Sequence, residues 1–63
     1  MQNEIRDRNG RLLGTLYVRG DSQELRDRNG TYCGKYENGN NETRDRHGKL
    51  VGSGNLLMTL LPN

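Results

Sequence analysis

Hydrophobic residues in this chain occur in short runs between polar turns, and three of the runs occupy the same position in a repeated unit. Each unit starts with an acidic residue and one variable residue, continues with Arg-Asp-Arg, Asn or His, and Gly, and ends in a short run closed by a second glycine. A glycine-containing turn between two short runs is typical of a β-hairpin. The sequence therefore predicts three hairpins, in units 4–16, 24–36 and 42–54.

The residues that recur in each turn are those that a tight turn requires. An aspartate oxygen can accept backbone hydrogen bonds across a turn, and glycine adopts positive φ without a steric penalty. We therefore expect the turns to be formed by equivalent residues of the three units, which are Asp7, Gly10, Asp27, Gly30, Asp45 and Gly48.

Two turn geometries fit this pattern and predict different strand registers. A two-residue type I′ turn on Asn-Gly would place Ile5 opposite Gly14. A type I turn followed by a glycine bulge would instead place Ile5 opposite Leu13, and Arg6 would then face Leu12. We favour the bulged form because it sets apolar residues against each other, and such cross-strand pairs are worth roughly 0.2–1 kcal/mol. The same register predicts two further pairs, Leu25 with Cys33 and Thr43 with Val51.

The connections between the units are rich in turn-forming residues, and Asn38-Gly39 can make a further hairpin turn. Neighbouring hairpins would then join into six or seven strands in meander order, and no run has the period of a long helix. Because both faces of such a sheet are only half apolar, we expect a thin sheet. The predicted fold is all-β, a single domain over residues 1–63 with three repeated hairpins in a meander or radial array.

The last segment, residues 55–63, departs from the repeat and is the most hydrophobic part of the chain. It has five apolar residues in six positions, so the alternation of a half-buried strand fails, as in a strand buried on both faces. We expect a terminal strand that packs against the sheet or pairs with a second copy. The alternative is a short helix folded back on the sheet.

Size and composition favour self-association. A chain of 63 residues buries little of its unfolded surface, and such small domains usually need disulfides, a metal or oligomerisation. One cysteine cannot close an internal disulfide, and one histidine with one cysteine cannot form a structural zinc site. We therefore expect a homo-oligomer, with a dimer first because two-fold contacts are the commonest. The expected interface consists of Leu56, Leu57, Met58, Leu60 and Leu61.

The sequence also indicates a location. No run approaches the ~18 apolar residues of a membrane span, and the first residues lack the basic and apolar regions of a secretory signal. A single free cysteine agrees with a reducing compartment. We expect a soluble, cytoplasmic protein that does not contact a membrane.

The spacing of Arg-Asp, two residues, Gly, three residues and Gly resembles the repeats of the five-fold β-flower family, bacterial all-β repeat proteins without an assigned chemistry. The three resembling units cover 33 of the 63 residues. The resemblance implies a radial or meandering array of hairpins and carries no information about function. The matching positions are Arg6, Asp7, Gly10 and Gly14, then Arg26, Asp27, Gly30 and Gly34, then Arg44, Asp45, Gly48 and Gly52.

The recurring aspartates do not predict an active site or a metal site. Acid–base catalysis of the glycosidase kind needs two carboxylates in different environments facing one cleft, and a calcium loop needs several closely spaced oxygen ligands. Here each aspartate stands alone between two arginines. Cys33 is interpreted as a small buried hydrophobe, and His47 as a turn residue tolerated in place of asparagine. We expect no enzymatic activity and no cofactor.

Six arginines occupy equivalent positions in the repeat, and a radial fold could gather them into a basic ring that binds phosphate. Each pair surrounds an aspartate and follows a glutamate, so much of the field cancels locally, and the net charge is only +2. The sequence therefore predicts a non-enzymatic structural or protein-interaction module of a bacterium or phage. The alternative is a weak nucleic-acid-binding accessory protein. Its phosphate contacts would be Arg6, Arg8, Arg26, Arg28, Arg44 and Arg46.

Overall fold

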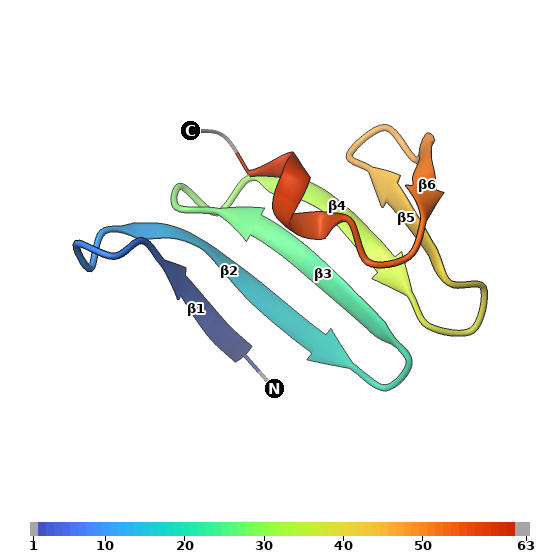
Figure 1. Ribbon diagram of the computed structural model, residues 1–63, viewed down its shortest axis with the longest axis horizontal. Coiled ribbons are helices and arrows are strands. Elements are labelled where there is room, and N and C mark those ends of the chain that lie inside the picture. Colours follow the sequence, from blue (N-terminus) through green and yellow to red (C-terminus); the bar gives the residue numbers. More distant parts are fainter. Residues whose placement is uncertain (1, 62–63) are drawn as a thin grey trace.

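The computed structural model describes residues 2–61, which form one antiparallel sheet of six strands in sequence order (Figure 1). The all-β hairpin meander predicted from the sequence is therefore confirmed. Each repeat unit supplies one hairpin. The strands are β1 (Gln2–Arg6), β2 (Leu12–Arg19), β3 (Ser22–Asp27), β4 (Tyr32–Glu37), β5 (Glu42–Asp45) and β6 (Leu50–Ser53).

The three hairpin turns have the same construction. In the first, the Gly10 N–H donates to the Asp7 carbonyl at 3.0 Å, and the Asp7 N–H donates to the Arg11 carbonyl at 3.0 Å. The Asp7 carboxylate also accepts the N–H groups of Asn9 and Arg11, at 2.9 and 3.0 Å. Gly10 has φ +84°, which glycine adopts without strain. The same bonds recur at Asp27 with Gly30 and at Asp45 with Gly48.

In each hairpin, the pair of residues next to the turn has the expected register, and the pairs farther from the turn are shifted by one residue. Arg6 lies opposite Leu12, as the bulged turn predicts. Ile5 then lies opposite Gly14, because Leu13 is an extra residue in a second bulge. The other expected pairs are wrong for the same reason. The structure has Leu25 opposite Gly34 instead of Cys33, and Thr43 opposite Gly52 instead of Val51.

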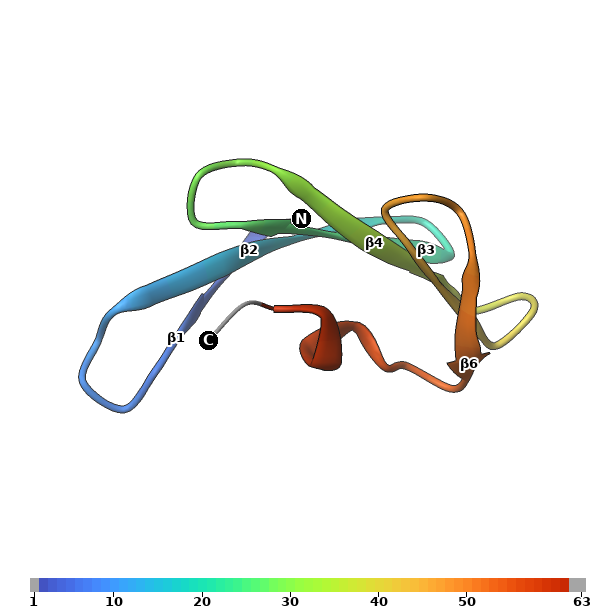
Figure 2. The same ribbon diagram turned by 90° about the horizontal axis from the view of Figure 1, so that it is seen from above.

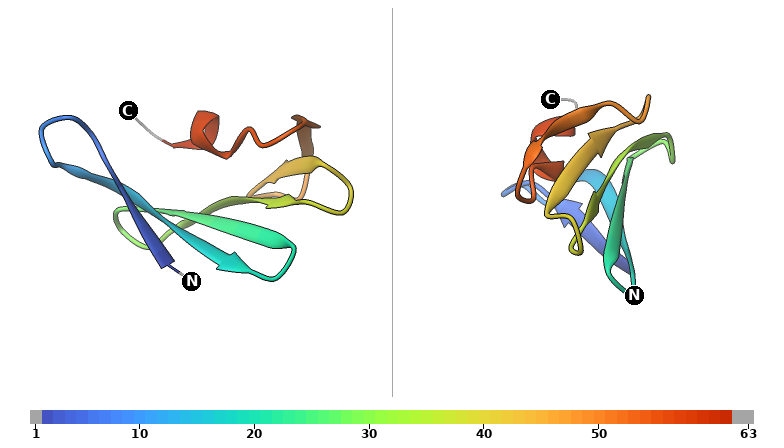
Figure 3. Two further views of the ribbon diagram at one scale, coloured as in Figure 1. Left: turned by 60° about the horizontal axis from the view of Figure 1, so that its bottom comes forward. Right: turned by 90° about the vertical axis from the view of Figure 1, so that its right-hand side faces the viewer.

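Residues 55–61, here called the tail, lie across one face of the sheet, which arches over them (Figure 2, Figure 3). The tail forms one 3₁₀ turn at Leu57–Leu60, so the expected strand is wrong and the helical alternative is observed. A strand would turn alternate leucines away from the sheet, whereas a helical turn brings Leu57, Leu60 and Leu61 to one side. Residues 62 and 63 of the expected strand lie outside the described part of the chain.

The second glycine of each unit gives the tail room to approach the sheet. A Cβ atom added to Gly14 would lie 2.5 Å from the carbonyl oxygen of Arg26 and 2.8 Å from Cδ2 of Leu61. A residue with a side chain at this position would therefore push the tail away. The leucines that meet the three glycines are Leu61 at Gly14, Leu60 at Gly34 and Leu56 at Gly52.

The hydrophobic core is small and lies between the sheet and the tail. Its most buried members within residues 2–61 are Leu25, Tyr36 and Leu57. Thr43 is also fully buried and fixes the start of the tail. Its hydroxyl donates to the Gly54 carbonyl at 2.6 Å and accepts the Leu56 N–H at 3.0 Å. The hydroxyl of this polar core residue is thus satisfied by the backbone of Gly54 and of the tail residue Leu56.

Candidate functional site

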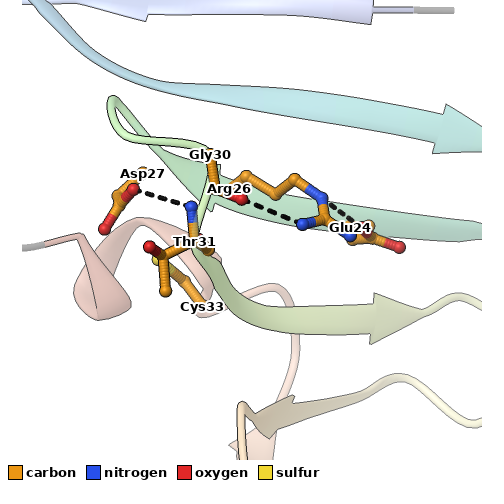
Figure 4. A network of polar contacts seen from close by, with 6 residues as sticks. All are labelled: Glu24, Arg26, Asp27, Gly30, Thr31 and Cys33. Carbon is orange, nitrogen blue, oxygen red and sulfur yellow. Dashed lines mark hydrogen bonds and ion pairs between the residues drawn. The ribbon is translucent and has the colours of Figure 1, made fainter.

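The first arginine of each unit is held by its own hairpin. Arg26 donates from Nη1 to the Gly30 carbonyl at 2.9 Å and from Nε to the Glu24 carboxylate at 2.7 Å (Figure 4). Arg6 and Arg44 make the equivalent contacts in their own units. Three of the six arginines expected to contact phosphate therefore connect a turn to its strand and already have acceptors.

The second arginine of each unit lies in the turn itself. The three turns share one end of the sheet, because alternate connections of a meander lie at the same end (Figure 1). Arg8, Arg28 and Arg46 are exposed there, and Arg46 Nε lies 3.4 Å from His47 Nε2. The sheet is open, so these arginines form a row and not the ring of a radial fold.

Aspartates in the same turns offset part of this positive charge. Asp45 accepts the backbone N–H groups of Lys49 and His47, at 3.0 and 2.8 Å. The Lys49 N–H, more than the other contacts, lowers the pKa of the Asp45 carboxyl, so this group stays ionised near neutral pH. Charges of both signs therefore alternate along this end of the sheet, which weakens its attraction for phosphate.

An open hollow of about 380 Å³ lies between the second and third turns and the tail. Cys33 and His47 both line it, a proximity that the sequence does not predict, together with Tyr32 and Leu60. The hollow forms because the turn of one unit flanks the bulge of the unit before it. The sequence signal for this proximity is that Cys33 directly precedes the second glycine of its unit, and His47 follows two residues after the aspartate that faces this glycine.

The surroundings of the Cys33 thiol in the hollow work against its ionisation. Burial and then the charge of Asp27 raise the pKa of the Cys33 thiol, whereas a nucleophilic cysteine needs a lowered pKa. The thiol donates to the Thr31 carbonyl at 3.6 Å. Within residues 2–61, no group of three or more His, Cys, Asp or Glu side chains is placed to hold a metal ion.

The outer strand β6 exposes apolar side chains at positions that are covered in the other units. Leu50 is 48% exposed and Val51 is 38% exposed. Another hairpin follows each of the first two units, but no strand lies beyond β6 among the described residues. The half-buried equivalents in those units are Leu12 and Tyr32 for Leu50, and Leu13 and Cys33 for Val51.

The tail residues expected at an oligomer interface mostly face the chain's own sheet. Leu57 is fully buried, and Leu56, Leu60 and Leu61 are half-buried. Met58 is 51% exposed. An oligomer interface on the tail stays a prediction, with Met58 as its most accessible member.

No protein family, curated protein or solved structure matches the chain. Residues 2–61 contain no helix with the length and apolar character required to cross a membrane.

Proposed function

We propose that the protein is a non-enzymatic structural or protein-interaction module that associates with itself. The observation that carries this function is the exposed apolar pair on the outer strand β6, Leu50 and Val51. Terminal units of repeat proteins usually present a polar outer surface, because an uncovered apolar edge recruits another chain. The third unit lacks such a polar surface, so its edge is suited to contact with a protein.

The small core supports the same function. The buried hydrophobic side chains of residues 2–61 are Leu25, Tyr36 and Leu57. A core of this size contributes little stability to an isolated domain, and burial of further apolar surface between copies would add to it. The free cysteine, Cys33, supports a location in the cytoplasm, where thiols remain reduced.

Light scattering of the intact chain over a dilution series tests self-association. We expect a mass above the 7.2 kDa of one chain, which falls on dilution. Changing Leu50→Ser together with Val51→Ser should shift the protein toward the monomer. Arg19→Ser, at an exposed position outside β6, is the control and should leave the mass unchanged. A mass of 7.2 kDa at every concentration would contradict the proposed function.

We also propose a second candidate function, that of an accessory protein that binds nucleic acid weakly. Its support is the row of exposed arginines in the turns, Arg8, Arg28 and Arg46. Changing all three to Gln should reduce binding to mixed DNA and RNA at low salt, whereas Arg19→Gln should not. Because phosphate contacts release counterions, true binding must weaken as salt rises. Binding that is absent, or independent of salt, removes this function.

A further inference from the structure

Neighbouring hairpins of the sheet contact each other in the same register each time. Where the first hairpin meets the second, Gly14 lies opposite Asp27. Where the second meets the third, Gly34 lies opposite Asp45. The second glycine of one unit therefore always faces the turn aspartate of the next unit.

The outer strands β1 and β6 each have one edge that no other strand of the described chain covers. Each of them also carries one of the two residues that face each other in this contact. Gly52 on β6 is the next glycine of the series, and Asp7 at the end of β1 is the preceding aspartate. We infer that β6 of one copy pairs antiparallel with β1 of a second copy, with Gly52 opposite Asp7 of that copy. This pairing rests on the proposed self-association and gives it a partner strand and a register.

The backbone of β6 is suited to the pairing. The Gly54 N–H donates to the Asn41 carbonyl at 2.8 Å, toward β5. Because alternate residues of a strand direct their backbone groups to opposite sides, the N–H and C=O of Ser53 point to the open edge. In the continued register, Ser53 lies opposite Arg6 of the second copy.

The edge of β1 offers the matching groups. The Asp7 N–H donates to the Arg11 carbonyl at 3.0 Å, toward β2. By the same alternation, the N–H and C=O of Arg6 point to the open edge of β1. Ser53 and Arg6 of the second copy can therefore exchange two backbone hydrogen bonds, as directly opposed residues of an antiparallel pair do.

The pairing also covers the apolar residues of β6. Inside the chain, the turn of the third unit brings His47 beside Tyr32 and Cys33 of the second unit, where all three line one hollow. In the continued array, the first turn of the second copy takes the same place beside Leu50 and Val51. The contact thus covers the two side chains that the isolated chain exposes.

The contact between copies is shorter than the contacts inside the chain. β2 and β3 align six residue pairs, and β4 and β5 align four. Gly54 has φ +87° and turns the chain toward the tail, so β6 offers mainly Gly52 and Ser53.

A head-to-tail pair still has one open β1 edge and one open β6 edge. Copies therefore add until a ring closes or a filament grows.

Cysteine cross-linking tests the register. Two variants, Ser53→Cys and Arg6→Cys, are made in a chain that also carries Cys33→Ala. Directly opposed residues of a hydrogen-bonded pair lie ~5.5 Å apart at Cα, which a disulfide can span. We expect an oxidised mixture of the two variants to form a disulfide-linked heterodimer. Each variant alone should remain a single chain on a denaturing gel.

The other outcomes overturn the pairing in distinguishable ways. A disulfide-linked homodimer of either variant would show that like edges meet in a two-fold dimer. If no disulfide forms but light scattering of the unmodified chain shows an oligomer, self-association stands and the interface lies elsewhere. A monomer in light scattering overturns both the pairing and the proposed function.

A second set of variants does not depend on disulfide chemistry. Ser53→Pro removes the outward N–H without removing a hydrogen bond to β5, since Ser53 points away from that strand. We expect Ser53→Pro to have the mass of one chain at concentrations where Ser53→Ala is assembled. Circular dichroism checks that both variants are folded. Assembly of a folded Ser53→Pro variant equal to that of Ser53→Ala would overturn the pairing.

Discussion

Replacing Gly14 with alanine tests whether the second glycine of each unit is what allows the tail to pack on the sheet. The added Cβ would lie 2.5 Å from the carbonyl oxygen of Arg26 and 2.8 Å from Cδ2 of Leu61. The first of these atoms belongs to the neighbouring strand, which cannot move without disturbing the sheet. Overpacking costs about 1–3 kcal/mol, which exceeds the ~0.4–1 kcal/mol that alanine gains by restricting the unfolded chain. We expect Gly14→Ala to lower the free energy of unfolding by about 1–2 kcal/mol.

Two other glycines provide graded controls. At Gly52 the added Cβ meets only Cδ1 of Leu56, at 2.9 Å, and this atom is the end of a flexible side chain. Gly52→Ala should therefore cost less than Gly14→Ala. At Gly39 no atom lies within 4 Å of the added Cβ. Gly39→Ala should be neutral or slightly stabilising, because only the unfolded chain is affected.

Urea unfolding followed by circular dichroism measures these differences, with all variants at one protein concentration because self-association raises apparent stability. Combining Gly52→Ala with Leu56→Ala adds a second readout, since removing the leucine should abolish the penalty of the added methyl group. Equal stability of Gly14→Ala and Gly39→Ala would refute the close approach of the neighbouring strand and the tail to Gly14. A penalty at Gly52 that persists without the Leu56 side chain would show that the strain lies in the sheet.

Three further predictions concern single side chains. Thr43→Val leaves the Gly54 carbonyl and the Leu56 N–H without the hydroxyl, and should lower the free energy of unfolding in urea by about 1–3 kcal/mol. Asp45 has a lowered pKa, so its stabilising contribution is present above its unfolded pKa and lost as pH falls through the folded pKa. In the Asp45→Asn variant, the melting temperature should fall less steeply as the pH is lowered than in the unmodified protein. An equally steep fall would contradict this prediction. Cys33 has a raised pKa, so iodoacetamide at mildly alkaline pH should modify it more slowly in the folded chain than in urea.

The hairpin turns could be predicted from the sequence because their geometry is decided locally. The carbonyl and carboxylate of Asp7 collect the N–H groups of the next residues, and Gly10 supplies the positive φ. All of these groups lie within one turn. The same residues recur twice more, so one local rule predicts three hairpins and the meander that joins them.

The sequence left the register beyond each turn open between two geometries, and the observed sheet combines them, with Arg6 opposite Leu12 from one and Ile5 opposite Gly14 from the other. The expected register placed Ile5 opposite Leu13 and favoured apolar pairs within a hairpin. The observed register places Gly14 there, where Leu61 of the tail approaches. The observed register thus sets a glycine at the place where the tail approaches, and gives up a cross-strand apolar pair worth only a fraction of a kcal/mol.

The form of the tail was ambiguous because short apolar runs fit a buried strand and a helical turn equally well. The spacing of Leu57, Leu60 and Leu61 is that of one side of a helical turn. The glycines of the sheet meet Leu56, Leu60 and Leu61, whereas Leu57 packs in the core with Leu25 and Tyr36. The row of glycines forms only when the hairpins lie side by side in the sheet, so the leucine spacing alone does not predict where the tail packs. The proximity of Cys33 to His47 was missed for the same reason, since it arises only between consecutive hairpins.

The polar edge of β1 raises an objection to pairing between copies, because covering it could bury the ion pair of Arg6 with Glu4. The equivalent pair inside the sheet answers the objection. Arg26 and Glu24 lie on β3 beside β2 of the neighbouring hairpin, and their charged atoms are 2.7 Å apart. Their side chains are 39% and 26% exposed, whereas those of Arg6 and Glu4 are 47% and 53% exposed. A neighbouring strand therefore reduces the exposure of such a pair without breaking it. The apolar edge of β6 can thus be covered by β1 of a second copy at a small electrostatic cost.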